Sequence, residues 1–105
     1  MNGDSKELKI EQVREGNVLN CKLTGWLDPN TSSDLVTQID LQDIALLIFD
    51  MKNVEYVFSS GIRAFLMLQR EMEPVGGGIK LVNASEEIRN IFEYAGLESM
   101  LDLKK

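Results

Sequence analysis

Two adjacent serines are the side chains best placed to do chemistry. Ser59 and Ser60 precede Gly61 where a loop meets an expected helix, and a glycine there lets another molecule approach the backbone closely. A phosphate at a helix N-terminus meets free N–H groups and the positive end of the helix dipole, so either hydroxyl is a candidate phosphoacceptor. The simpler alternative is that both serines only cap the helix. Because Ser60 lies next to Gly61, we expect Ser60 to cap the helix and Ser59 to stay exposed.

Carboxylates in loops are the second possible source of chemistry. Asp28, Asp50 and Glu55 are the best-placed acids, and paired carboxylates can act as acid and base or hold Mg²⁺. An enzyme would need a pocket lined by Asp28 or Asp50 in which the carboxyl pKa is raised. A domain of this size rarely encloses such a pocket, and no acidic loop has the spacing of a calcium site. We therefore expect solvated acids, with no catalytic residues, no metal site and no cofactor.

Composition excludes several classes of protein. The sequence has no histidine, which rules out Ser-His-Asp and Cys-His catalysis and imidazole metal sites. Its single cysteine, Cys21, cannot form an internal disulfide and is expected to pack in the core. The formal net charge is −6, so nucleic acids and anionic membranes are poor partners. We find no signal peptide and no apolar run that could span a membrane, and we expect a cytoplasmic protein.

The elements that must position these residues form one domain. A chain of 105 residues with 44% hydrophobic residues can bury a single core, so we assign residues 1–105 to one domain and expect residues 1–7 to be a flexible N-terminus. Near-alternation at 8–13 and 18–24 around Glu15-Gly16-Asn17 predicts a hairpin. A helix should follow from Thr31, as its N-cap, to about Ile39.

The middle of the chain predicts a buried strand and a second helix. The short, continuously apolar run 44–49 is typical of a strand covered on both faces, with 51–58 as a connection to the serines. The helix should cover 62–73 and stop at Pro74. Its apolar surface is wider than one face requires, so we expect Met67 or Leu68 to be presented to a partner near the serines. Ordinary core packing is the alternative.

The last third predicts a strand and a third helix. Three glycines at 76–78 precede the strand 79–82, whereas a nucleotide-binding glycine loop would precede a helix. Ser85 should cap a helix that ends at Gly96. Residues 97–103 fit either a strand or a helical turn. The order of elements predicts an α/β fold in which helices pack on a mixed sheet.

Five blocks of sequence, taken in order, resemble the STAS domain, the module of anti-sigma factor antagonists and of the cytoplasmic tails of sulfate transporters. The match covers nearly the whole chain. The blocks are Leu23–Asp28 with Thr31, Leu46–Asp50, Val54–Ile62, the glycine turn with Ile79–Val82, and Ile88–Leu97. The resemblance implies a sheet of four or five strands with helices packed on it.

The resemblance also implies a function. In such antagonists an anti-sigma factor serine kinase with a histidine-kinase-like ATPase fold phosphorylates the first serine of the loop, which corresponds here to Ser59. The unphosphorylated form captures that kinase, and a sigma factor is freed. Asp28 matches an acidic position beside the site, whereas Phe58 replaces the usual Asp before the acceptor serine. The partner-binding residues we expect are Asp28, Ser59, Ser60, Gly61 and Met67.

Two classes of function therefore remain. The first is a regulatory interaction module without catalytic activity, which binds neither nucleic acid nor membrane directly. The second is a STAS accessory subunit of a transporter ATPase, acting in lipid or anion transport without a phosphorylation cycle. Self-association is left open.

Overall fold

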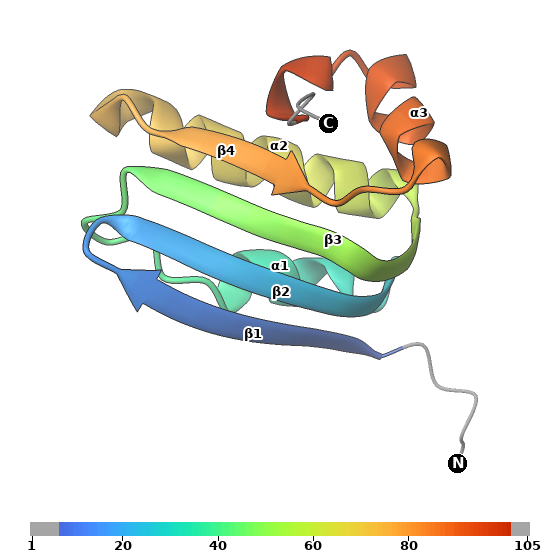
Figure 1. Cartoon of the computed structure of the whole chain (residues 1–105), viewed down its shortest axis with the longest axis horizontal. Helices are drawn as coiled ribbons and strands as arrows, with labels where there is room; N and C mark the ends of the chain where they lie inside the picture. The colour runs from blue at the N-terminus through green and yellow to red at the C-terminus, as the bar shows by residue number, and fades with distance from the viewer. Residues whose placement is uncertain (1–6, 102–105) are drawn as a thin grey trace.

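The computed structural model describes residues 7–101, which form a four-stranded sheet with helices packed on it. Two helices, α1 and α2, lie behind the sheet in the view of Figure 1, and no helix of the described residues covers the face toward the viewer. The elements in chain order are β1 (Leu8–Glu15), β2 (Val18–Leu27), α1 (Ser32–Thr37), β3 (Leu46–Val57), α2 (Ser59–Met72), η1 (Glu73–Val75), β4 (Gly78–Val82), α3 (Glu86–Tyr94) and η2 (Glu98–Met100). The prediction of an α/β fold with a mixed sheet is confirmed.

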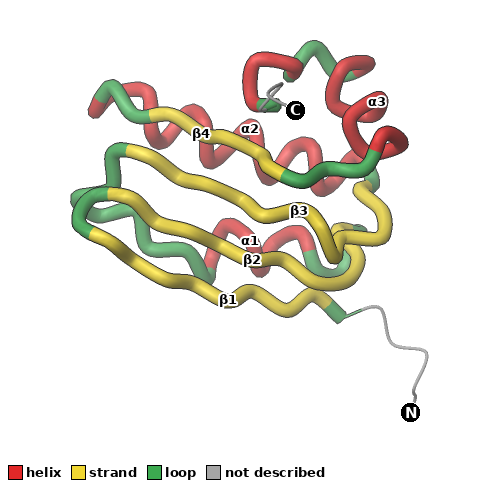
Figure 2. The backbone as a smooth tube through the Cα atoms, in the orientation of Figure 1, coloured by secondary structure: helices red, strands yellow, loops and turns green. Residues whose placement is uncertain are grey.

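The strands run in the spatial order β1-β2-β3-β4. The predicted hairpin joins β1 and β2 as antiparallel neighbours, and Gly16 supplies the positive φ of its turn. β3 then pairs parallel to β2 and to β4, so the C-terminal ends of β2 and β3 meet at one edge of the molecule (Figure 2). This edge carries the turn into α1 and the start of α2.

The central strand is much longer than predicted. β3 runs from Leu46 to Val57, so the expected connection at 51–58 is wrong. Its second half mixes polar and apolar residues, but Met51, Val54 and Val57 are buried and continue the strand's inward face. Register shifts in the pairing with β2 accommodate this irregular spacing. The strand therefore leads directly into the serine pair, with Phe58 as the single residue between them.

The predicted helix boundaries differ from the observed ones by up to three residues: α2 begins at Ser59 rather than at Ile62 and ends at Met72 rather than at Glu73. α1 begins after Thr31 as expected but stops at Thr37, two residues before the predicted end. The Thr31 hydroxyl does not cap it and instead donates to the Trp26 carbonyl oxygen at 2.7 Å. The predicted cap of α3 is confirmed, because the Ser85 hydroxyl accepts a hydrogen bond from the Ile88 N–H at 3.2 Å.

One hydrophobic core lies between the sheet and its helices. Phe65 of α2 packs edge-on against Phe49 of β3 and Phe92 of α3, with ring centroids 5.0 and 5.3 Å apart. Cys21 is 1% exposed, and burial raises the pKa of its thiol to about 12, which confirms its predicted role in packing.

The termini resolve one open alternative. Residues 97–103 were compatible with a strand or a helical turn, and both occur in part: η2 is a short 3-10 turn, and Leu101 then forms a single parallel bridge to Leu81. Residues 102–105 lie outside the described part of the chain, as do 1–6 of the expected flexible N-terminus. Glu7 is exposed and precedes β1. No helix in the described residues is long and apolar enough to cross a membrane.

Candidate functional site

Asp28 organises the turn that connects β2 to α1. Its carboxylate oxygen Oδ1 accepts hydrogen bonds from the N–H of Asn30 at 2.9 Å and the N–H of Thr31 at 3.1 Å, and the Thr31 hydroxyl oxygen lies 3.1 Å from it. The residue is 8% exposed. Asp28 therefore fixes the backbone beside the serines, and a direct contact between its carboxylate and a partner stays a prediction.

A chain of hydroxyls connects this turn to the serine pair. The Ser32 hydroxyl donates to the Asp28 carbonyl oxygen at 2.8 Å, and the oxygens of Ser32 and Ser60 lie 3.3 Å apart. Ser60 is half-buried. The prediction that Ser60 caps α2 is wrong: the N-cap position is Phe58, and no side chain caps the helix. The contact with Ser32, which is distant in sequence, engages this hydroxyl instead.

Ser59 differs from its neighbour. It is the first residue of α2, its side chain is exposed as predicted, and it makes no side-chain hydrogen bond to any described residue. The hydroxyl is therefore accessible to a modifying enzyme.

Gly61 is a buried residue in the first turn of α2, and packing within the chain requires a glycine there. A Cβ at this position would lie 2.9 Å from both the Leu27 Cβ and the Val57 Cγ1, and 3.2 Å from the Leu27 carbonyl oxygen. Only a residue without a side chain lets the first turn of α2 rest on the ends of β2 and β3. Contact of Gly61 with a partner stays a prediction.

The two candidates for a partner contact on α2 separate clearly. Met67 is 50% exposed, whereas Leu68 is 1% exposed and belongs to the core. Met67 follows Ser59 by eight residues, which is about 12 Å along a helix. Met67 is therefore available to a partner that also covers the serine end of α2, while the alternative of Leu68 is wrong.

The serine end of α2 is positively polarised. Its first turn contains no acidic residue, and Arg63 is the only charged side chain between Ser59 and Gln69. Arg63 is exposed, lies one turn after Ser59 and forms no ion pair with a described residue. Free N–H groups, the helix dipole and this guanidinium together favour negative charge on Ser59.

Three aromatic rings beside the serines were missed by the sequence analysis. Trp26 and Tyr56 are register partners on β2 and β3, and Phe58 follows β3. The ring centroids lie 6.2 Å apart for Trp26 and Tyr56, 6.0 Å for Trp26 and Phe58, and 4.9 Å for Tyr56 and Phe58. We call these three residues the aromatic cluster. The signal was a tryptophan and two other aromatics at the ends of two strands, but their adjacency depends on the register.

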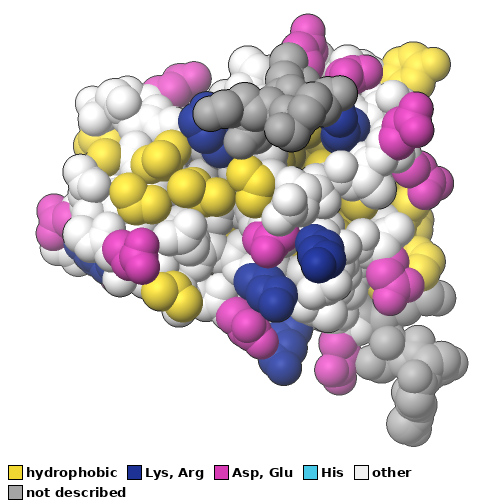
Figure 3. Space-filling view, in the orientation of Figure 1, with side chains coloured by type: hydrophobic (Ala, Val, Ile, Leu, Met, Phe, Trp, Pro, Cys, Tyr) yellow, Lys and Arg dark blue, Asp and Glu magenta, His cyan; other side chains and the backbone are white. Residues whose placement is uncertain are grey.

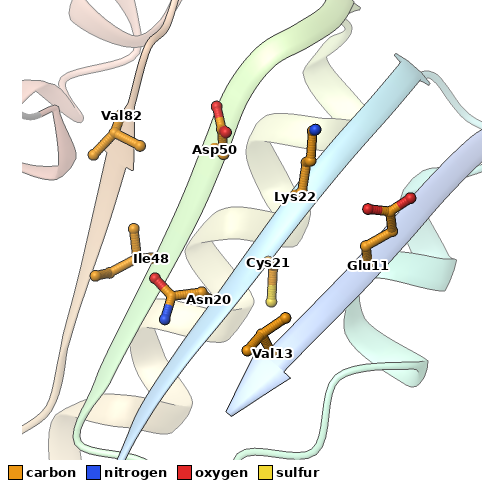
Figure 4. Close-up of a pocket in the computed structure, with 8 residues that line it drawn as sticks. All are labelled: Glu11, Val13, Asn20, Cys21, Lys22, Ile48, Asp50 and Val82. Carbon is orange, nitrogen blue, oxygen red and sulfur yellow. The ribbon is translucent and has the colours of Figure 1, made fainter. Parts of the chain in front are cut away.

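The prediction of three solvated loop acids is wrong in two respects: Asp50 and Glu55 lie in β3, and Asp28 lies in a turn but is buried. Asp50 lies on the helix-free face of the sheet and lines a hollow of 280 Å³ together with Glu11 and Lys22 (Figure 4). Its Oδ1 accepts hydrogen bonds from the Lys52 N–H at 3.1 Å and the Asn83 side chain at 3.0 Å. Asp28 is not among the residues that line this hollow. Among the described residues, no three side chains of Asp, Glu or Cys are grouped so that they could hold a metal ion.

Comparisons with known proteins identify the family to which the chain belongs. The STAS domain family model matches residues 10–105. The anti-sigma F factor antagonist of Lysinibacillus sphaericus is 27% identical over 93 residues, which cover 85% of this chain and 79% of that protein. The anti-sigma-B factor antagonist of Bacillus subtilis is 32% identical over 53 residues, about half of each chain (50% and 49%).

Solved structures show the same fold. The anti-sigma factor antagonist SpoIIAA in its unphosphorylated form matches with a TM-score of 0.79 and 24% identity, over 90% of this chain and 85% of that one. The phosphorylated form of SpoIIAA matches with a TM-score of 0.67 and 24% identity, over 90% and 88%.

Proposed function

The chain belongs to the STAS domain family, and from this premise we propose that it is an anti-sigma factor antagonist switched by phosphorylation of Ser59. In this proposal the unphosphorylated form captures an anti-sigma factor, and phosphorylation releases it. The curated relatives support this class, because both are named antagonists of anti-sigma factors.

The observation that carries the proposal is the different environment of the two serines. Ser60 is half-buried against Ser32, whereas the Ser59 hydroxyl is exposed at the positive end of α2. A kinase can therefore reach Ser59 without unfolding the turn. The solved relative SpoIIAA occurs in unphosphorylated and phosphorylated forms, which fits a reversible modification in this fold.

Release follows from the chemistry of the added group. A phosphate adds a charge of about −1.5 to −2. Ser59 directly follows Phe58, whose ring is 38% exposed, so a partner that covers Ser59 covers apolar surface as well. Burying a phosphate in such a contact without compensation costs several kcal/mol. Arg63 is the nearest cation along the helix, and pairing with the phosphate would also withdraw it from the partner.

The partner in this proposal is a serine kinase with a histidine-kinase-like ATPase fold, and the chain itself is not an enzyme. The switch needs no catalytic group of this chain, because the partner supplies the phosphoryl transfer. The contact surface comprises Ser59 and Ser60 at the start of α2, the neighbouring Asp28 turn, and Met67 further along the helix. An accessory role on a transporter ATPase is less well supported, because both curated relatives are sigma-factor regulators.

Affinity capture from a native lysate of the source organism, with and without ATP, tests the proposal. We expect an anti-sigma factor to be retained without ATP, and retention to fall when ATP allows phosphorylation. Intact-mass analysis and peptide mapping should place one phosphate on Ser59.

Substitutions define the outcome. Ser59→Ala should retain the partner in both conditions, and Ser59→Asp should lose it. Ser99→Asp is the matched control, because Ser99 is also exposed but lies in η2, and it should bind as the unmodified chain does. Phosphate on another residue, or full binding by Ser59→Asp, would refute the switch. Retention of a transporter ATPase subunit regardless of Ser59 would favour the alternative.

A further inference from the structure

The aromatic cluster is an uncharged surface in a chain of net charge −6. Phe58 is 38% exposed, and Trp26 and Tyr56 are half-buried beside it. The space-filling view shows that several apolar side chains lie side by side on the left and centre of the helix-free face, with charged side chains below and to the right of them (Figure 3). The cluster combines three rings without a charged group among them, which is typical of the central anchors of protein interfaces.

The position of Phe58 is unfavourable for the fold alone. Phe58 is the N-cap residue of α2, where Ser, Thr, Asp or Asn would accept a hydrogen bond from a free N–H group. Phe58 gives up that cap and leaves its ring partly in water. A local choice that weakens the helix and exposes an aromatic ring indicates a role outside folding.

The ring is also held in place before any partner arrives. The Phe58 N–H donates to the Leu27 carbonyl oxygen at 2.8 Å, and the ring stacks on Trp26 at 30° and meets Tyr56 edge-on at 77°. An aromatic side chain that is already ordered loses little conformational entropy when it is covered.

The position of Phe58 next to Ser59 indicates which protein would cover the aromatic ring. Phe58 and Ser59 are consecutive and both exposed, so the protein that shields the Ser59 hydroxyl must also lie against the Phe58 ring. Because the cluster carries no charge, its complement is an apolar depression on that protein, and charged contacts fall outside it.

We propose that the aromatic cluster is the anchor of the partner interface: Phe58, backed by Trp26 and Tyr56, inserts into an apolar depression on the captured anti-sigma factor. This inference rests on the proposed function.

Photo-crosslinking tests the contact directly. The probe is the protein that the unmodified chain retains without ATP, and the crosslinker is p-benzoylphenylalanine in place of Phe58. The matched control carries the same group in place of Val75, which is 68% exposed in η1, beyond the C-terminal end of α2. We expect a crosslink from position 58, mapped to an apolar peptide of the anti-sigma factor, and none from position 75.

Binding measurements complete the test. Phe58→Ala should weaken binding by about tenfold or more, as expected for an interface anchor, and Phe58→Leu should lose less. Val75→Ala should bind normally. Trp26 is the only tryptophan, so 5-fluorotryptophan labelling gives one fluorine NMR resonance, which should shift when the partner binds. This resonance also reports whether the Phe58 variants are folded.

The two proposals can fail separately. If Ser59→Asp abolishes binding while folded Phe58→Ala binds fully, the switch stands and the anchor is refuted. Crosslinks from position 75 but not from 58, or between two copies of this chain, would also refute the anchor. If no anti-sigma factor is retained at all, both proposals are wrong.

Discussion

Gly61→Ala should destabilise the protein, although alanine favours helices over glycine. The added Cβ would lie 2.9 Å from side-chain atoms of Leu27 and Val57, which are 0% and 1% exposed, and 3.2 Å from a backbone oxygen. None of these atoms belongs to a flexible side chain that can swing into solvent. Overpacking a core costs about 1–3 kcal/mol, and two contacts below 3.0 Å favour the upper part of this range, about 2–3 kcal/mol, of which the helix preference of alanine returns about 1 kcal/mol. We therefore expect a net loss of about 1–2 kcal/mol.

This loss can be measured by thermal and urea unfolding. For a domain of this size 1 kcal/mol corresponds to about 4–8 °C, so the Tm of Gly61→Ala should fall by roughly 4–16 °C. Gly78→Ala is the matched control, because a Cβ at Gly78 meets nothing within 4 Å and the residue has no positive φ. Its stability should change little. If Gly61→Ala were as stable as the unmodified protein, the close packing of α2 on the strand ends would be refuted.

Two further predictions concern charge. Because burial raises the pKa of the Cys21 thiol to about 12 from an ordinary value near 9, the unfolded chain loses this proton first as pH rises, so between pH 9 and 12 the Cys21→Ala variant should lose stability less steeply than the unmodified protein. Equal slopes in urea unfolding would contradict this. Phosphoserine installed at position 59 should have a lower second pKa than in an Arg63→Gln background, as followed by phosphorus NMR, because the guanidinium one turn away favours the dianion. Arg70→Gln is the control, and identical titrations in all three proteins would exclude the pairing.

Sequence patterns correctly predicted those helices and strands that depend on a few neighbouring residues. The hairpin depends on Gly16 between alternating segments, and the cap of α3 depends on Ser85 ahead of two glutamates, so both were found. The second half of β3 was missed because irregular pairing with β2 breaks the alternation there. Its inward face becomes visible only when Val54 and Val57 are seen in the core. Register, which joins Trp26 to Tyr56, has no local signal either.

The serine pair shows why a site of this kind cannot be read from one loop. Ser59 and Ser60 have the same side chain and nearly the same sequence context. Capping rules predicted correctly that Ser59 is exposed, but the reason was wrong, because Ser60 does not cap α2. The difference between them arises from Ser32, which lies 28 residues away and reaches Ser60 because Asp28 fixes the intervening turn.

Phe58 is a residue that local helix-capping preference does not explain. An Asp at this N-cap would stabilise α2 by about 1 kcal/mol, yet the chain places a partly exposed ring there. The fold holds Ser60 through its contact with Ser32 and leaves the two preceding side chains, Phe58 and Ser59, exposed, as the proposed partner interface requires. In the proposed switch, an apolar anchor next to the phosphoacceptor would strengthen the response, because the same contact that favours the bare hydroxyl would exclude the phosphate.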